Sequence, residues 1–204
     1  MSRISSLAVL QTRMVLELPG CPEMLRVQAL QEAFQEFCRE SEAWREELAP
    51  IDIVEDQLEY DLIPEFDAMI LRLEWVKLNT EDGVTEGLEP DPLAVELYTL
   101  TPGDPEVLTL DDGLEPTEAI TDALTVKAIL IPEFNSLDIS EWMLNLHYRT
   151  LVAGALDIRL RDANKRWTNP ARAADYAMRF RDGIQTAKAE VTRDYKQGSS
   201  VLPM

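Results

Sequence analysis

The spacing of apolar positions divides the chain into helical ends and a β-rich middle. From Glu23 to Glu47 apolar residues step by three and four positions, which predicts a long amphipathic helix ending before Pro50. Arg3 to Leu16 carries a shorter stripe of the same period and predicts a short helix. The two stripes consist of Ile4, Leu7, Ala8, Met14 and Val15, and of Val27, Leu30, Phe34, Phe37 and Trp44.

After Pro50 the period falls to two, and β-branched and aromatic residues stand between turn signals. The longest of the predicted strands has one strongly buried face, formed by Met69, Leu71, Leu73 and Trp75. The predicted strands are Ile51–Val54, Leu58–Leu62, Met69–Asn79, Leu93–Leu100, Glu106–Leu110 and Asp122–Pro132.

Helical spacing returns near Asp138, which together with Glu141 resembles a capping box. The helix that follows is expected to reach about Arg161, and Asn169-Pro170 then predicts an N-cap and first-turn proline. The two buried stripes are expected to be Leu144, Tyr148, Leu151, Ala155 and Ile158, then Ala173, Ala177, Phe180, Ile184, Ala187 and Val191.

These elements predict an α+β fold, in which N- and C-terminal helices form one bundle and a β-rich region with an antiparallel sheet is inserted into it. The bundle helices are expected in residues 1–49 and 136–195, the acidic β-rich region in 50–135, and a flexible tail in 196–204. With 204 residues the chain can bury about 70% of its unfolded surface.

Composition narrows the class of protein. The chain is 46% hydrophobic and 28% charged, as in ordinary globular proteins. No run approaches the roughly 20 apolar residues of a membrane helix, so we expect neither a membrane span nor a signal peptide. Cys21 and Cys38 are therefore expected to be reduced thiols in a cytoplasmic compartment.

The net charge of −19 is unevenly distributed. Residues 1–137 hold 30 acidic residues and 8 basic ones, whereas residues 138–204 hold 8 and 11. Between Lys77 and Lys127 there are 13 acidic residues and no Lys or Arg. Such a surface repels phosphate, which disfavours sequence-specific nucleic-acid binding there. The simplest interpretation is a solvated acidic face that aids solubility.

Signatures of chemistry are mostly absent. The single histidine, His147, lies on an apolar stretch and is expected in the core or at its boundary, and the glycines form no nucleotide or acyl-transfer motif. Acidic pairs lack the calcium-loop pattern. We therefore expect no catalytic residue, cofactor or metal, and no enzymatic activity. Trp142 and Trp167 are expected to pack, either in the core or between subunits.

Basic residues gather around the connector between the last two predicted helices. With an acidic body attached, contact with an acidic protein surface is favoured over phosphate binding. The residues of this connector cluster are Arg159, Arg161, Lys165, Arg166 and Arg172.

Several sequence segments together resemble a known family. They are Leu18-Pro19-Gly20-Cys21-Pro22, residues 29–38 (ALQEAFQEFC), residues 44–51 (WREELAPI), Ala153-Gly154-Ala155-Leu156 and Trp167-Thr168-Asn169-Pro170, with Phe180 and Ala187 beyond. The chain resembles the head–tail adaptor (connector) proteins of tailed bacteriophages over about residues 1–62 and 123–195. The shared motifs are packing motifs, and the acidic middle matches only in being β-rich.

The resemblance implies a virion protein of the neck, made in the host cytoplasm. It implies a ring of about twelve copies beneath the portal protein, with a tail-side neck, stopper or tail protein below. DNA passes through the centre without specific binding, and no membrane is involved. An acidic protein suits such a conduit because negative walls do not bind the phosphate backbone.

Two sets of residues are expected to serve this role. The acidic stretch is expected to face either the DNA channel or a basic neighbouring protein, and the channel or its rim is favoured, through Glu81, Asp82, Asp111 and Asp112. The C-terminal segment, as in similar adaptors, is expected to bind the portal through Arg193, Lys196, Val201, Leu202, Pro203 and Met204.

Two other classes of function stay open. A DNA mimic would share the acidity but needs carboxylates in phosphate-like rows, whereas many acids here fall in segments interrupted by Pro and Gly. An unrecognised enzyme would need a cleft with carboxylates of perturbed pKa.

Overall fold

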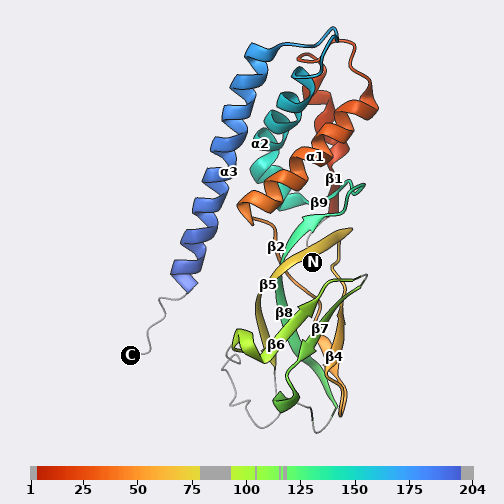
Figure 1. Cartoon of the computed structure of the whole chain (residues 1–204), viewed down its shortest axis with the longest axis vertical. Helices are drawn as coiled ribbons and strands as arrows, with labels where there is room; N and C mark the ends of the chain where they lie inside the picture. Colours follow the sequence, from red (N-terminus) through yellow and green to blue (C-terminus); the bar gives the residue numbers. More distant parts are fainter. Residues whose placement is uncertain (1–3, 79–92, 104, 115, 117–118, 199–204) are drawn as a thin grey trace. The chain divides into compact units, whose positions relative to one another are not determined.

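The computed structural model describes residues 4–78, 93–103, 105–114, 116 and 119–198, without the side chains of residues 96, 112 and 194–198. The fold is α+β, as predicted, with helices and antiparallel sheets (Figure 1). The chain forms two compact units. The helical unit comprises residues 1–44 and 131–204, and the β unit comprises residues 45–130. The sequence pattern predicts both boundaries between the helical and β regions later in the chain, at 49/50 and 135/136.

The N-terminal segment differs from the predicted helix over Arg3 to Leu16. Ile4–Ser6 form strand β1, which pairs antiparallel with β9, Asp138–Ser140. Leu7–Met14 then form a 3₁₀ helix, η1, which buries Leu7, Leu10 and Met14. The Ser6 side chain accepts a hydrogen bond from the backbone N–H of Ala8 and caps η1.

Helix α1 spans Glu23–Ser41 and is shorter than predicted. Glu42 adopts a left-handed conformation with φ of 53°, and its N–H donates to the carbonyl of Cys38, which ends the helix. The prediction to Glu47 was wrong because Trp44 keeps the apolar spacing although it lies beyond this turn. Its ring stacks on Phe34 of α1, with centroids 5.2 Å apart.

Helix α2 spans Glu141–Leu160, and α3 spans Pro170–Gly198. Asn169 caps α3 as predicted, since its side chain accepts from the N–H of Arg172. The predicted capping box at Asp138 is wrong, because Asp138 lies in β9 and Ser140 occupies the N-cap position of α2. Residues 196–198, expected in a flexible tail, belong to α3.

The buried faces of α2 and α3 agree with the prediction to different extents. In α3 the predicted stripe is buried through Ala187, and Val191 is half-buried. In α2 the buried stripe begins one residue earlier than predicted, at Met143 and His147, which leaves Leu144 and Tyr148 half-buried.

Two glycines allow the helices to approach closely. A Cβ added at Gly154 of α2 would lie 2.8 Å from the Phe180 ring of α3 and 2.9 Å from the Cβ of Ala33 of α1. A Cβ at Gly183 of α3 would overlap the side chain of Thr150 of α2. The three helices therefore meet at a contact that only glycine at position 154 permits.

The described strands of the β unit form two sheets. In one, the long strand β8 (Ile120–Pro132) pairs with β2 (Arg45–Glu47), β3 (Ile51–Ile53) and β5 (Ala68–Leu78). The other has the order β4-β7-β6 and is antiparallel throughout. Its strands are β4 (Glu59–Leu62), β7 (Glu106–Leu110) and β6 (Tyr98–Thr101), and the short 3₁₀ helices η3 (Val95–Leu97) and η4 (Asp112–Leu114) flank them.

The predicted face of β5 is less buried than expected. Met69 is 42% exposed, and the other three predicted residues, Leu71, Leu73 and Trp75, are half-buried. On the opposite face Ile70 and Val76 are buried, while Arg72 is exposed. Glu74 on that face is half-buried, and its carboxylate binds Arg45 at 2.6 Å and Lys127 at 3.4 Å.

We expect Gly154→Ala to destabilise the helical unit by about 1–3 kcal/mol, because the Phe180 ring and Ala33 would have to shift. This loss is expected despite a gain of about 1 kcal/mol in intrinsic helix propensity. The measurement is urea unfolding followed by far-UV circular dichroism. Asn145→Ala, at an exposed position of the same helix, is the matched control and should be neutral or slightly stabilising. Equal or greater stability of Gly154→Ala would contradict the close contact.

Candidate functional site

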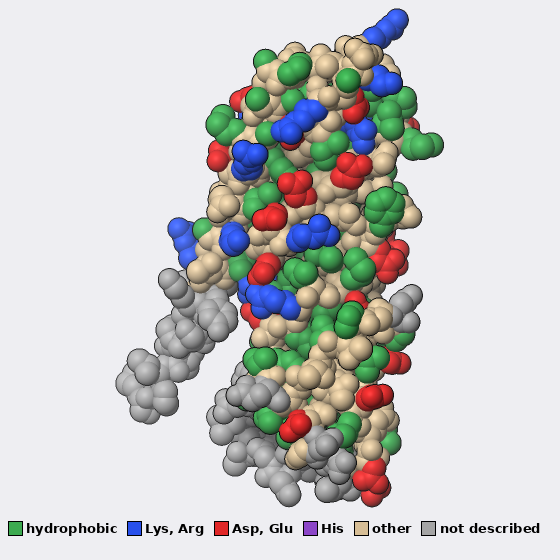
Figure 2. Space-filling model, in the orientation of Figure 1, with side chains coloured by type: hydrophobic (Ala, Val, Ile, Leu, Met, Phe, Trp, Pro, Cys, Tyr) green, Lys and Arg blue, Asp and Glu red, His purple; other side chains and the backbone are tan. Residues whose placement is uncertain are grey.

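The net charge of the protein lies in one unit. By sequence the helical unit holds 15 acidic and 15 basic residues, whereas the β unit holds 23 acidic and 4 basic ones. In Figure 2 the charged side chains seen at the lower end of the β unit are acidic, while both signs are seen over the helices. Most basic residues of the chain therefore belong to the helical unit, which is neutral overall.

A groove of about 480 Å³ opens on the helical unit between η1, α2 and α3. Its floor is apolar, formed by Val152, Ala153 and Leu156. Its walls carry polar and charged side chains, namely Arg13, Glu17, Tyr148, Arg149, Thr150, Tyr176 and Arg179. We call this the arginine–tyrosine groove.

Two arginines flank the ring of Tyr148. The guanidinium of Arg13, from η1, lies 4.5 Å from the ring centroid, and that of Arg149 lies 5.6 Å from it. The Nε–H of Arg149 also donates to the Tyr148 hydroxyl at 3.0 Å. This hydrogen bond and the charge of Arg149 lower the pKa of Tyr148, and Arg13 adds to the shift. Among the described residues, neither arginine forms an ion pair.

On the α3 side of the groove each arginine has an acidic partner. Tyr176 of α3 also lies beneath two arginines, with Arg179 at 5.3 Å and Arg172 at 5.9 Å from its centroid. Arg179 pairs with Asp175, and Arg172 pairs with Glu17. The groove thus has one wall whose cations are neutralised and one wall whose cations are not.

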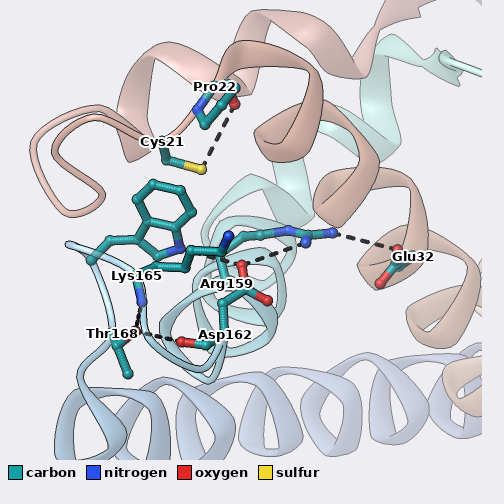
Figure 3. A network of polar contacts seen from close by, with 8 residues as sticks. Cys21, Pro22, Glu32, Arg159, Asp162, Lys165 and Thr168 are labelled. Carbon is teal, nitrogen blue, oxygen red and sulfur yellow. Dashed lines mark hydrogen bonds and ion pairs between the residues drawn. The ribbon is translucent and has the colours of Figure 1, made fainter.

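The connector between α2 and α3 is held by a separate network (Figure 3). Arg159 lies between Glu32 of α1, at 3.5 Å, and Asp162, at 3.6 Å. Asp162 also accepts a hydrogen bond from the indole N–H of Trp167. Thr168 closes the turn, donating to the carbonyl of Asp162 and accepting from the N–H of Lys165.

This network changes the interpretation of the basic connector cluster. Arg159 is only 9% exposed, and Arg161 pairs with Asp157 four residues before it. Arg172 binds Glu17, so these three residues already have acidic partners within the chain. Lys165 and Arg166 are exposed. The cluster therefore mainly holds the connector against the helices, and Trp167 packs there as a buried side chain.

The predicted portal-binding residues fall at and beyond the end of α3. Arg193 is exposed on α3, and Lys196 lies in the same helix. The side chain of Lys196 lies outside the description, as do Val201, Leu202, Pro203 and Met204.

The predicted channel residues are described only in part. Glu81 and Asp82 lie outside the described residues. Asp111 is exposed after β7, where its carbonyl accepts from Leu114, and Asp112 begins η4.

His147 is a buried residue of α2, 7% exposed, with its ring 4.8 Å from that of Phe37. Burial lowers its pKa from 6.5 to about 4, so the folded protein holds it neutral. Cys21 and Cys38 are buried free thiols, and burial raises the pKa of both.

Within the described ranges, no group of three or more His, Cys, Asp or Glu side chains could hold a metal ion. No helix in this part of the chain is long and apolar enough to cross a membrane.

Sequence reasoning missed the arginine–tyrosine groove. Tyr148 was assigned to the buried stripe, and Arg13 lies far from Arg149 in the chain. The adjacent Tyr148-Arg149 pair was the only local signal, and it is common on helices.

The chain matches no protein-family model, and no curated protein sequence is significantly similar to it.

The low pKa of His147 predicts a pH dependence of stability. As pH falls from 6.5 towards 4, the unfolded chain binds a proton that the folded chain does not. The free energy of unfolding should therefore fall by up to about 1.4 kcal/mol per pH unit from this residue, with no contribution above about pH 7. We expect His147→Gln to remove this slope.

The measurement is urea unfolding of wild type and variant at about pH 7 and pH 5, followed by the far-UV circular dichroism of the helices. The difference between the two proteins isolates His147 from the many carboxylates that titrate in the same range. Parallel pH dependences would show that His147 is not buried in the neutral form.

Proposed function

We propose that this protein is a head–tail adaptor of a tailed-bacteriophage virion. Its copies form a ring beneath the portal protein that connects the capsid to a tail-side neck, stopper or tail protein. DNA passes through the ring without specific binding. The proposal starts from the family resemblance of residues 1–62 and 123–195.

The observation that carries the proposal furthest is the separation of charge between the two units. A β unit with 23 acidic and 4 basic residues is suited to a surface that DNA passes without adhering, since fixed negative charge repels phosphate. A helical unit with equal numbers of both signs is suited to protein contacts, which need charge of either sign at chosen places.

The end of α3 provides a second support. The last buried side chain of the helix is Ala187, and the described side chains from Lys188 to Arg193 are exposed or half-buried. Figure 1 shows these turns running past the ends of α1 and α2. A helix that continues without packing in its own unit offers a surface to another protein.

Mixing the purified full chain with its portal protein and imaging the complex tests the proposal. We expect rings of the chain seated on the portal. A small free oligomer that never joins the portal would contradict the proposal and favour a DNA mimic or another interaction protein.

The same assay tests the C-terminal segment. Deletion of residues 199–204, or Arg193→Glu within α3, should weaken portal binding at least about tenfold, because ring symmetry multiplies a small contact. Lys165→Glu, at an exposed connector position, is the matched control for Arg193→Glu and should bind normally. Undiminished binding by both altered proteins would contradict this role of the segment.

Charge reversal tests the acidic unit separately. Changing Glu81, Asp82, Asp111 and Asp112 to Lys should make assembled rings retain DNA, and added salt should release it. Retained DNA is measured after gel filtration of rings mixed with linear duplex. The four corresponding changes to Asn or Gln remove charge without adding cations and should retain less DNA. Assembled reversed rings without added DNA would show that these residues do not face the channel.

A further inference from the structure

Two cations of the arginine–tyrosine groove, Arg13 and Arg149, form no ion pair among the described residues. Arg13 and Arg149 lie against one tyrosine ring, and both are exposed. Each carries a positive charge that no described ion pair neutralises, so an anion bound beside these guanidinium groups would be stabilised. Guanidinium groups bind carboxylates with two parallel hydrogen bonds, which makes a carboxylate a fitting occupant.

The β unit carries an exposed acidic row on β4 and the bend that follows it. Glu59, Asp61, Glu65 and Asp67 are exposed, while Tyr60, Leu62 and Phe66 between them are buried. Alternate residues of a strand lie about 6.8 Å apart on one face, so Glu59 and Asp61 are neighbours along it. Among the described residues no Lys or Arg forms an ion pair with any of the four carboxylates.

The position of this acidic row makes it accessible. In its sheet β4 pairs only with β7, so among the described strands it lies at an edge. Charged side chains on an edge strand discourage strand addition, which is a sufficient reason for some of them. Carboxylates on an edge also project to where another molecule can reach them.

We propose that the arginine–tyrosine groove of one copy binds the β4 acidic row of a second copy. Two different surfaces of the chain then meet, which makes the contact heterologous, and repetition of such a contact closes a ring or extends a filament. This inference rests on the proposed function, because the ring belongs to that proposal. The new statement is which two surfaces neighbouring copies use to contact one another in it.

DNA phosphate and the acidic row of the same chain are the two alternative occupants of the groove. DNA phosphate is disfavoured because the protein carries a net charge of −19, and because Glu17 and Asp175 present carboxylates beside Arg172 and Arg179. The acidic row of the same chain would fill the groove without self-association. Both alternatives are outcomes of the test below.

The test uses full-length chains with reversed charges. The groove variant carries Arg13→Glu and Arg149→Glu, and the strand variant carries Glu59→Lys and Asp61→Lys. A control carries Arg39→Glu and Arg181→Glu, which are exposed on α1 and α3 outside the groove. Circular dichroism and thermal melting confirm that each variant is folded, as expected for changes at exposed positions.

Sedimentation velocity measures self-association at low and high salt. We expect wild type and the control to associate at low salt and to dissociate as salt is raised. The groove and strand variants should each associate at least about tenfold more weakly, because like charges then face one another. An equimolar mixture of the two variants should regain association, since each reversed surface finds its reversed complement in the other chain.

Three results would overturn the inference. They are a wild-type chain that stays monomeric at low salt, a groove variant that associates like wild type, and a mixture that does not regain association. Binding of a fluorescent duplex by wild type that the groove variant loses would assign the groove to phosphate instead. Rings that form on the portal despite any of these results would leave the proposed function standing and remove only this contact.

Discussion

The close approach of α2 to its two neighbours at Gly154 determines how the helical unit is built. The Phe180 ring and Ala33 occupy the space that a side chain at this position would need. The spacing of α2 and α3 at this point also sets the walls of the arginine–tyrosine groove. Tyr148 precedes Gly154 by less than two turns on α2, and Tyr176 precedes Phe180 by one turn on α3. A packing constraint in the core thus positions the charged groups at the surface.

The β unit uses its few cations internally. Of its four basic residues, Arg45 and Lys127 both bind the half-buried Glu74. Buried Glu106 is satisfied by a backbone donor, the N–H of Ile70. Inward-facing carboxylates therefore have partners, while exposed ones such as Glu59 and Asp61 have no described cation beside them. The negative charge of the β unit is therefore carried mainly by exposed carboxylates and not by those in its interior.

Periodicity predicted the class of fold and most helical elements, and it failed where the deciding feature leaves no signal in the spacing of apolar residues. The stripe of α3 was correct through Ala187 because every member faces the same neighbours. The end of α1 was missed because the left-handed turn at Glu42 leaves no signal in the apolar spacing. The apolar alternation of β5 gave no sign that Ile70 and Val76 are its buried residues, because Glu74 on their face is held inside by cations distant in sequence.

The candidate site was less predictable than the fold. Exposed residues follow no period, so only the packing of η1 against α2 brings Arg13 to Tyr148. The acidity of the middle region was visible at once, but the pairing of β4 with β7 was needed to show which carboxylates lie on an exposed edge.

The points where the chain enters and leaves the β unit determine how freely the sequence of that unit can change. Arg45, the first residue of that unit, pairs with Ile129 near its end, so the two crossing points are neighbours across an antiparallel ladder. For the helical unit, the inserted residues 45–130 are therefore equivalent to a hairpin, because Arg45 and Ile129 at the two ends of the insertion lie about 5 Å apart. The strands between them can be lengthened, shortened or recharged while the bundle keeps its core, as long as that one pair of strands is preserved.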